Sequence, residues 1–211
     1  MTRSELFALT AALTASMTGP VAAQGASTTL RPESKVMLAG SSNVHDWACR
    51  SSVFQATIEL DTAYQTRPMI ELAKPIKKVA VTVPVTSLKC GHGKMDENMY
   101  KALRASEFPD IQYVLASYEV DTGLTTRDGF TAKTFGDLTV AGKTVRVEIP
   151  ITALRKEGGS MTGEGTLKLL MTDFGIKPPV ALLGTLRTKN EIQISFSVQL
   201  DKTVVVALQQ P

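Results

Sequence analysis

The chain has 211 residues and a net charge of +3, with lysines and arginines scattered among the acids. This even distribution of charge argues against a nucleic acid as partner, which would require a basic stripe or patch. One domain with a sizeable core is the expectation at this length. The hydrophobic residues are mostly valine, isoleucine and leucine, threonine is frequent and only 6% of the residues are aromatic, which favours strands over helices.

The amino terminus has the features of an export signal. Arg3 precedes an apolar run at 6–17 that is too short to span a bilayer, and Gly19 and Pro20 interrupt it. Small residues at 21–23 then suit a cleavage site after Ala23. The sequence therefore predicts a signal peptide at 1–23 and a periplasmic or secreted protein.

The segment that follows predicts the organisation of the mature chain. Residues 24–34 are polar and are expected to form a flexible leader, and 35–211 are expected to form the single domain. The predicted new terminus carries no cysteine that could take a lipid, and no later run is long enough for a transmembrane helix. A transmembrane anchor is not expected.

Two cysteines, Cys49 and Cys90, lie in turn-rich contexts of this exported chain. In an oxidising compartment their plainest use is a disulfide, which would stabilise the fold by roughly 4 kcal/mol in the chain-entropy model. A metal or redox site is the alternative, because His45, Asp46 and His92 lie near the cysteines. The spacings match no standard zinc pattern, so the disulfide is favoured.

Alternation of apolar and polar residues with a period of two recurs along the chain and predicts strands with one dry face. The alternation is regular at 54–60, 79–85, 145–151 and 192–200. Further strands are expected at 35–49, 111–121, 130–140 and 161–172. Glycine-containing turns separate several of these segments.

One helix interrupts the strands at 94–106. Met95, Met99 and Leu103 fall on one side at helical spacing, and Pro109 follows the end of the helix. The apolar side is expected to pack against the sheet, or to form a lid over a cavity.

About eight antiparallel strands with one short helix define an all-β fold. Such strands can close into an eight-stranded antiparallel barrel, which removes exposed sheet edges and leaves an interior for side chains or one small ligand. A two-sheet sandwich fits the alternation nearly as well, and periodicity alone does not decide between them.

The order of five stretches along the chain resembles the YceI-like family of exported, lipocalin-type, polyisoprenoid-binding barrels. The stretches are 40–47 (GSSNVHDW), 83–88 (VPVTSL), 95–111 with its helix and Phe-Pro-Asp-Ile, 136–144 (GDLTVAGKT) and 173–176 (DFGI). No stretch is specific alone; their shared order carries the resemblance. The resemblance implies a lipocalin-like barrel over 35–211 that binds an apolar lipid.

The resemblance also implies a hollow interior lined by inward side chains, although the same residues suit a filled core. The expected lining is Val81, Val83, Tyr113, Leu138, Val147, Ile149, Ile194, Phe196 and Val198, with Met99, Leu103 and Phe108 near an entrance. Trp47 and His45 are candidates for contact with a ring or headgroup, or for ordinary structural roles.

Catalytic motifs are missing from the sequence. It contains no Gly-x-Ser-x-Gly elbow, no His-Glu-x-x-His pair and no phosphate loop. The main hypothesis is therefore a non-enzymatic carrier of an isoprenoid lipid or quinone tail, without another cofactor or metal. A packed structural or stress-response barrel and a metal or redox partner are the alternatives, and a homodimer is left open.

Overall fold

The computed structural model describes residues 28–29, 33–61, 63 and 67–200. The predicted signal peptide at 1–23 lies outside the described residues.

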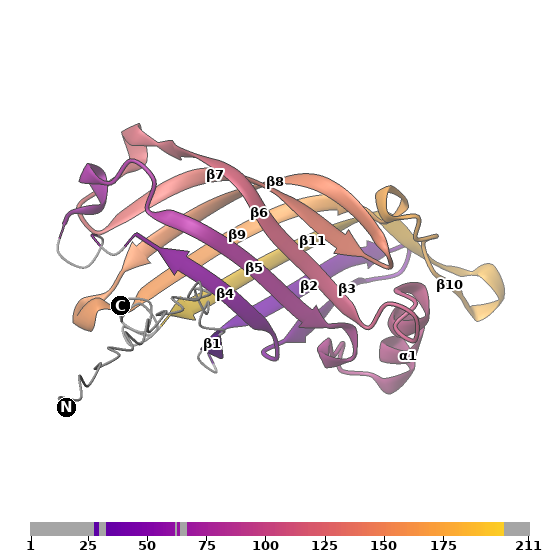
Figure 1. The fold of residues 1–211 in the computed structure, drawn as a ribbon. Coiled ribbons are helices and arrows are strands. Elements are labelled where there is room, and N and C mark those ends of the chain that lie inside the picture. Colours follow the sequence, from indigo (N-terminus) through magenta and orange to yellow (C-terminus); the bar gives the residue numbers. More distant parts are fainter. Residues whose placement is uncertain (1–27, 30–32, 62, 64–66, 201–211) are drawn as a thin grey trace, which may run out of the picture.

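The fold is all-β, as predicted, and is built on one antiparallel sheet that curls into a half-barrel (Figure 1). The strands are β1 (Thr28–Thr29), β2 (Lys35–Ser42), β3 (Asp46–Ser51), β4 (Gln55–Leu60), β5 (Ile76–Pro84), β6 (Asp110–Asp121), β7 (Gly129–Val140), β8 (Lys143–Arg155), β9 (Met161–Leu170), β10 (Val180–Ala181) and β11 (Leu186–Leu200). They pair in the order β1-β4-β5-β6-β7-β8-β9-β11-β2-β3, with β10 on β11. The predicted antiparallel barrel architecture is confirmed, with nine longer strands in the described chain instead of eight.

The ninth long strand arises because the segment 35–49 folds back on itself. Ser42 makes the turn: its Oγ accepts from the N–H groups of Val44 at 3.1 Å and His45 at 3.0 Å, while its own N–H donates to the His45 carbonyl at 2.9 Å. A serine hydroxyl that bonds local backbone in this way competes with a continuous strand. The segment therefore forms the hairpin of β2 and β3.

The helix α1 (Gly93–Ala102) lies at one end of the half-barrel and is shorter than predicted (Figure 1). Arg104 adopts a left-handed conformation with φ of 53°, and the N–H groups of Arg104 and Ala105 donate to the carbonyls of Lys101 and Tyr100. This Schellman arrangement ends the helix before 106. Short 3-10 helices occur at η2 (Met69–Glu71), η3 (Val85–Ser87), η4 (Thr122–Leu124), η5 (Glu157–Gly159), η6 (Met171–Phe174) and η7 (Leu182–Gly184).

Two packed apolar clusters occupy the concave side of the sheet. One contains Met69, Phe130 and Tyr118, and the other contains Leu103 and Phe174. The Tyr118 hydroxyl is fully paired, because it accepts from the Ile76 N–H at 2.8 Å and donates to the Ile76 carbonyl at 2.9 Å. Both clusters draw on strands that are distant in sequence, so they hold the curled sheet together.

The strand path has two ends, β3 and β1–β4, and β3 is tied to the chain that follows β5. Arg50 and Lys89 exchange two backbone hydrogen bonds of 2.8 Å, and the Ser51 and Ser87 hydroxyls lie 2.8 Å apart. The disulfide expected between Cys49 and Cys90 joins the same two segments. The edge strand β3 is therefore held covalently to the opposite side of the sheet.

The segment for which a flexible leader is predicted, 24–34, contributes to the fold at two points. Thr28 and Thr29 pair with β4 as β1. Ser34 is buried, and its Oγ accepts from the Gln199 N–H at 2.9 Å. The chain before β2 is thus joined to both β4 and β11.

Replacing both cysteines by alanine is expected to lower the free energy of unfolding by about 2–4 kcal/mol, because the bridge spans 41 residues and restricts the unfolded chain. Urea denaturation of the oxidised wild type and of Cys49→Ala/Cys90→Ala measures the difference. Reduced wild-type protein should match the variant. Equal midpoints for oxidised wild type and variant would contradict a stabilising role for the bridge.

Candidate ligand-binding cavity

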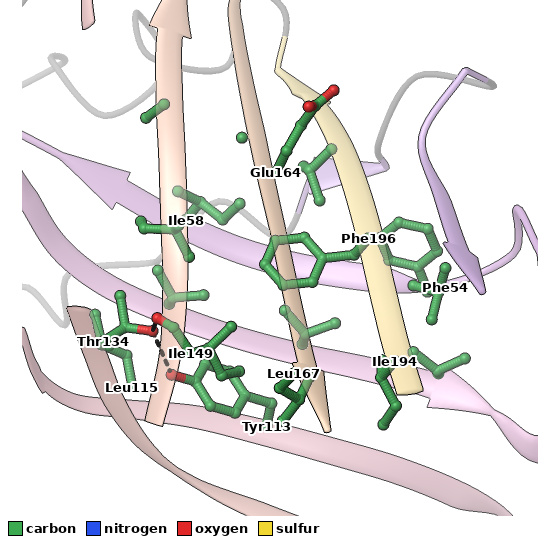
Figure 2. A pocket seen from close by; sticks show the side chains of 18 of the residues that line it. Phe54, Ile58, Tyr113, Leu115, Thr134, Ile149, Glu164, Leu167, Ile194 and Phe196 are labelled. Atoms are coloured by element: carbon green, nitrogen blue, oxygen red, sulfur yellow. Dashed lines mark hydrogen bonds between the residues drawn. The ribbon is translucent and has the colours of Figure 1, made fainter. Parts of the chain in front are cut away.

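A cavity of about 200 Å³ lies on the concave side of the sheet (Figure 2). Its lining is almost entirely aliphatic and aromatic. It consists of Val36, Leu38, Phe54, Ile58, Ile76, Val79, Val81, Val83, Leu88, Ile111, Tyr113, Leu115, Phe130, Thr134, Leu138, Ile149, Ile151, Ala153, Met161, Thr162, Gly163, Glu164, Leu167, Ile194, Phe196, Val198 and Leu200.

The alternation of the strands places these side chains. On β6, Tyr113 and Leu115 face the cavity, whereas Val114 between them is 52% exposed on the outer face. On β11, Ile194 and Phe196 likewise face inward (Figure 2). Several inward residues are only half-buried, because their free side borders the hollow and not another side chain. The cavity is therefore a direct product of the period-two pattern.

Two hydroxyl groups interrupt the apolar lining. The Tyr113 hydroxyl donates to Thr134 Oγ1 at 3.4 Å, and Thr134 Oγ1 donates to the Ile149 carbonyl at 2.8 Å (Figure 2). Burial raises the pKa of Tyr113 above its ordinary value, so the phenol stays neutral at physiological pH. The site therefore presents one neutral phenol to its apolar interior.

A glycine makes room for the ring of Tyr113. A Cβ placed on Gly136 of β7 would lie 2.5 Å from Cε2, Cζ and the hydroxyl of Tyr113. The ring thus lies directly against the β7 backbone, at a distance that any other residue at 136 would prevent. This contact fixes the position of the hydroxyl beside the β7 backbone.

The side chain of one acidic residue next to the cavity points to the outer face of the sheet. Glu164 of β9 is exposed, and its Oε1 accepts from the Ser197 hydroxyl at 3.1 Å. Neighbouring Gly163 has open space where a side chain would be. No lysine, arginine or histidine of the described residues lines the cavity. Among the described residues, the lining therefore offers no cationic partner for an anionic group.

Most of the side chains predicted to line the interior lie on this cavity. They are Val81, Val83, Tyr113, Leu138, Ile149, Ile194, Phe196 and Val198. Their contact with a ligand remains a prediction. Leu115 and Thr134 also line the cavity but were not predicted from the sequence. Both continue the alternation of predicted residues on their strands, Tyr113 on β6 and Leu138 on β7.

Val147 and Trp47 do not lie on this cavity. Val147 faces the same side as Ile149 but is enclosed in the second packed cluster. The ring of Trp47 packs on Gly40, where a Cβ would lie 2.4 Å from Cζ2. Trp47 borders a separate surface hollow that includes Lys189.

Met99, Leu103 and Phe108, the three residues predicted near an entrance, lie at the α1 end. None of them lines the cavity. Leu103 is buried in the second cluster, and Met99 packs against that cluster. The Arg104 guanidinium stacks on the Phe108 ring, with its Cζ 4.7 Å from the ring centroid. The same ring covers Gly142. These side chains close this end of the half-barrel by packing.

The metal or redox alternative would need the sulfurs of Cys49 and Cys90, and both are bonded to each other in the disulfide. His45 is exposed, and its Nδ1 lies 3.1 Å from the Asp46 carbonyl; His92 is also exposed. Among the described residues, no three histidine, cysteine or acidic side chains are grouped as metal ligands. The described geometry offers no starting point for a metal centre.

The sequence matches the model of the YceI-like domain over residues 26–200. The chain belongs to the YceI-like family. No curated protein matches it. Within the described chain, no helix has both the length and the apolar character needed to cross a bilayer.

Solved structures of YceI-like and related proteins share the fold at low sequence identity. Burkholderia cenocepacia BcnA is 19% identical with a TM-score of 0.65, covering 82% of this chain and 99% of BcnA. A polyisoprenoid-binding domain from Saccharophagus degradans, implicated in plant cell wall breakdown, is 13% identical with a TM-score of 0.62, covering 83% and 97%. The Campylobacter jejuni YceI protein is 16% identical with a TM-score of 0.55, covering 77% and 84%. These likenesses establish the fold.

Gly136→Ala is expected to lower the free energy of unfolding by about 1–3 kcal/mol, because the added methyl group overlaps the Tyr113 ring. Gly163→Ala is the matched control, since its methyl group would enter open space on β9, another strand of the same lining. Urea denaturation should show the first variant destabilised and the second unchanged or slightly stabilised. Equal destabilisation of both would contradict the described position of the Tyr113 ring.

Proposed function

We propose that this YceI-like protein is an exported carrier that binds an apolar isoprenoid-type lipid, such as a polyprenyl chain or quinone tail, inside the half-barrel. The apolar cavity is the observation that supports this function most strongly. Export is supported by the signal-like amino terminus and by the disulfide, which is typical of oxidising compartments.

The chemistry of the lining suits a branched hydrocarbon. Burying hydrocarbon contributes about 0.8 kcal/mol for each CH₂-sized group, so each five-carbon unit offers roughly 3–4 kcal/mol before costs. The lining has few polar side chains, so a ligand needs few polar groups to match it. A carrier of this kind selects for apolar shape first.

The size of the cavity limits what this conformation can hold. Its volume of about 200 Å³ exceeds the roughly 150 Å³ of an engineered cavity that accepts benzene, but is below the roughly 300 Å³ of the smallest common ligand pockets. Association costs several kcal/mol, so micromolar affinity requires about four buried isoprene units. Loading a long chain therefore requires the inward side chains to move apart.

A packed structural or stress-response barrel is the competing function. The two apolar clusters at the ends of the half-barrel are the observation that favours it, because they fill much of the interior. The two functions differ in what they demand of the remaining cavity: a carrier needs it, whereas a packed barrel gains stability when it is filled.

Leu115→Trp is expected to fill part of the cavity and to weaken binding of geranylgeraniol at least tenfold, because its larger side chain occupies ligand space. The adjacent Val114→Trp is the matched control, since Val114 lies on the outer face of the same strand. Calorimetric titration of both variants and the wild type provides the measurement.

The wild type and Val114→Trp should bind alike. Absence of binding to the wild type, or equal affinity of the two variants, would refute the carrier function. Increased stability of Leu115→Trp together with absence of wild-type binding would favour the packed barrel.

A further inference from the structure

The hydroxyl of Tyr113 is poorly satisfied for a group at an apolar cavity. Thr134 is its one hydrogen-bond partner within the described chain, and the O···O distance of 3.4 Å is well beyond the roughly 2.7–2.8 Å that hydroxyl pairs prefer. Thr134 is 4% exposed and directs its own hydrogen to the Ile149 carbonyl. A weakly paired hydroxyl in a dry site is costly, and a ligand oxygen would relieve that cost.

Tyr118 shows what a satisfied tyrosine looks like in the same strand. Its hydroxyl both accepts from and donates to the backbone of Ile76, at 2.8 and 2.9 Å, and Tyr118 does not line the cavity. β6 therefore carries one tyrosine with a structural hydrogen-bond pair and one whose hydroxyl faces the cavity without a good partner.

The charges around the cavity restrict the kind of oxygen that can approach Tyr113. No cationic side chain of the described residues lines it, and its lining is almost entirely aliphatic and aromatic. An anionic group drawn inside would lose its hydration without a counterion, which is strongly unfavourable. A neutral hydroxyl or carbonyl loses much less.

We infer that Tyr113 is a specificity-determining residue, whose hydroxyl hydrogen-bonds a neutral oxygen of an isoprenoid ligand and so favours prenyl alcohols, ketones and quinones over anionic prenyl phosphates. This inference rests on the proposed carrier function. The raised pKa of Tyr113 is consistent with it, because a phenol that stays protonated can both donate to a carbonyl and accept from a hydroxyl.

The contact with Gly136 determines where that oxygen must lie. The ring is held against the β7 backbone, so the hydroxyl has little freedom to follow a ligand. Leu138, which pairs with Tyr113 across β6 and β7, and Ile149 belong to the same lining. The ligand must therefore place its oxygen beside Tyr113 while its hydrocarbon contacts the aliphatic side chains.

Calorimetric titration with matched short prenyl compounds tests this role. The probes are geraniol, geranial, geranyl diphosphate and the corresponding hydrocarbon without oxygen. Tyr113→Phe is expected to reduce the affinity for geraniol and geranial, relative to the hydrocarbon, about two- to tenfold. Tyr118→Phe is the matched control: it is expected to lower the thermal midpoint but to leave this affinity ratio as in the wild type.

The wild type supplies a second test that needs no substitution, because geraniol should bind more tightly than geranyl diphosphate. An unchanged ratio in Tyr113→Phe, or tighter binding of the diphosphate, would overturn the role of Tyr113 while leaving the carrier function intact. If the wild type binds neither these probes nor the four-unit geranylgeraniol, both proposals fall.

Discussion

Alternate side chains of an antiparallel strand point to opposite faces, and in a curled sheet one of those faces becomes an interior. This constraint governs the protein. Along β6 it turns Tyr113 and Leu115 inward and Val114 outward, and the other long strands contribute in the same way. Because the sheet curls around an interior, strands on its opposite sides are far apart at some points. Medium-sized aliphatic side chains from those strands do not reach one another there. A hollow is left where they fall short.

Larger or clustered side chains close the ends of that hollow. Met69 and Phe130 are buried in one cluster, and Leu103 and Phe174 in the other. The side where the strand path ends is held by the Cys49–Cys90 bridge and the neighbouring backbone and serine hydrogen bonds. These contacts keep an incompletely closed sheet around a dry interior, and a dry interior is what gives a single weakly paired hydroxyl its chemical importance.

The sequence was sufficient for the features that depend on local pattern. The alternation predicted the all-β class and eight of the side chains that line the cavity. The order of the motifs predicted the YceI-like family, which the match over 26–200 confirms. The pairing of the cysteines followed from their number and the inferred compartment.

Features that depend on tertiary context or on a single local bond were not predictable in the same way. The turn at Ser42 depends on one hydroxyl, and the end of α1 depends on a left-handed Arg104, a conformation that composition does not suggest. Val147 has the pattern of a lining residue but lies in a packed region, because periodicity gives the direction of a side chain and not the volume around it. Trp47 was a candidate for a headgroup contact or a structural role, and its ring packs on Gly40 and against the second cluster instead of bordering the cavity.

The most direct measurement of a ligand-holding interior is mass spectrometry of organic extracts from the protein isolated without detergent from its own cells. A hollow carrier predicts that prenyl compounds bearing a neutral oxygen co-purify in near-stoichiometric amount with the wild type. Recovery of no prenyl compound from freshly isolated protein, at a sensitivity that detects added geranylgeraniol, would contradict the account.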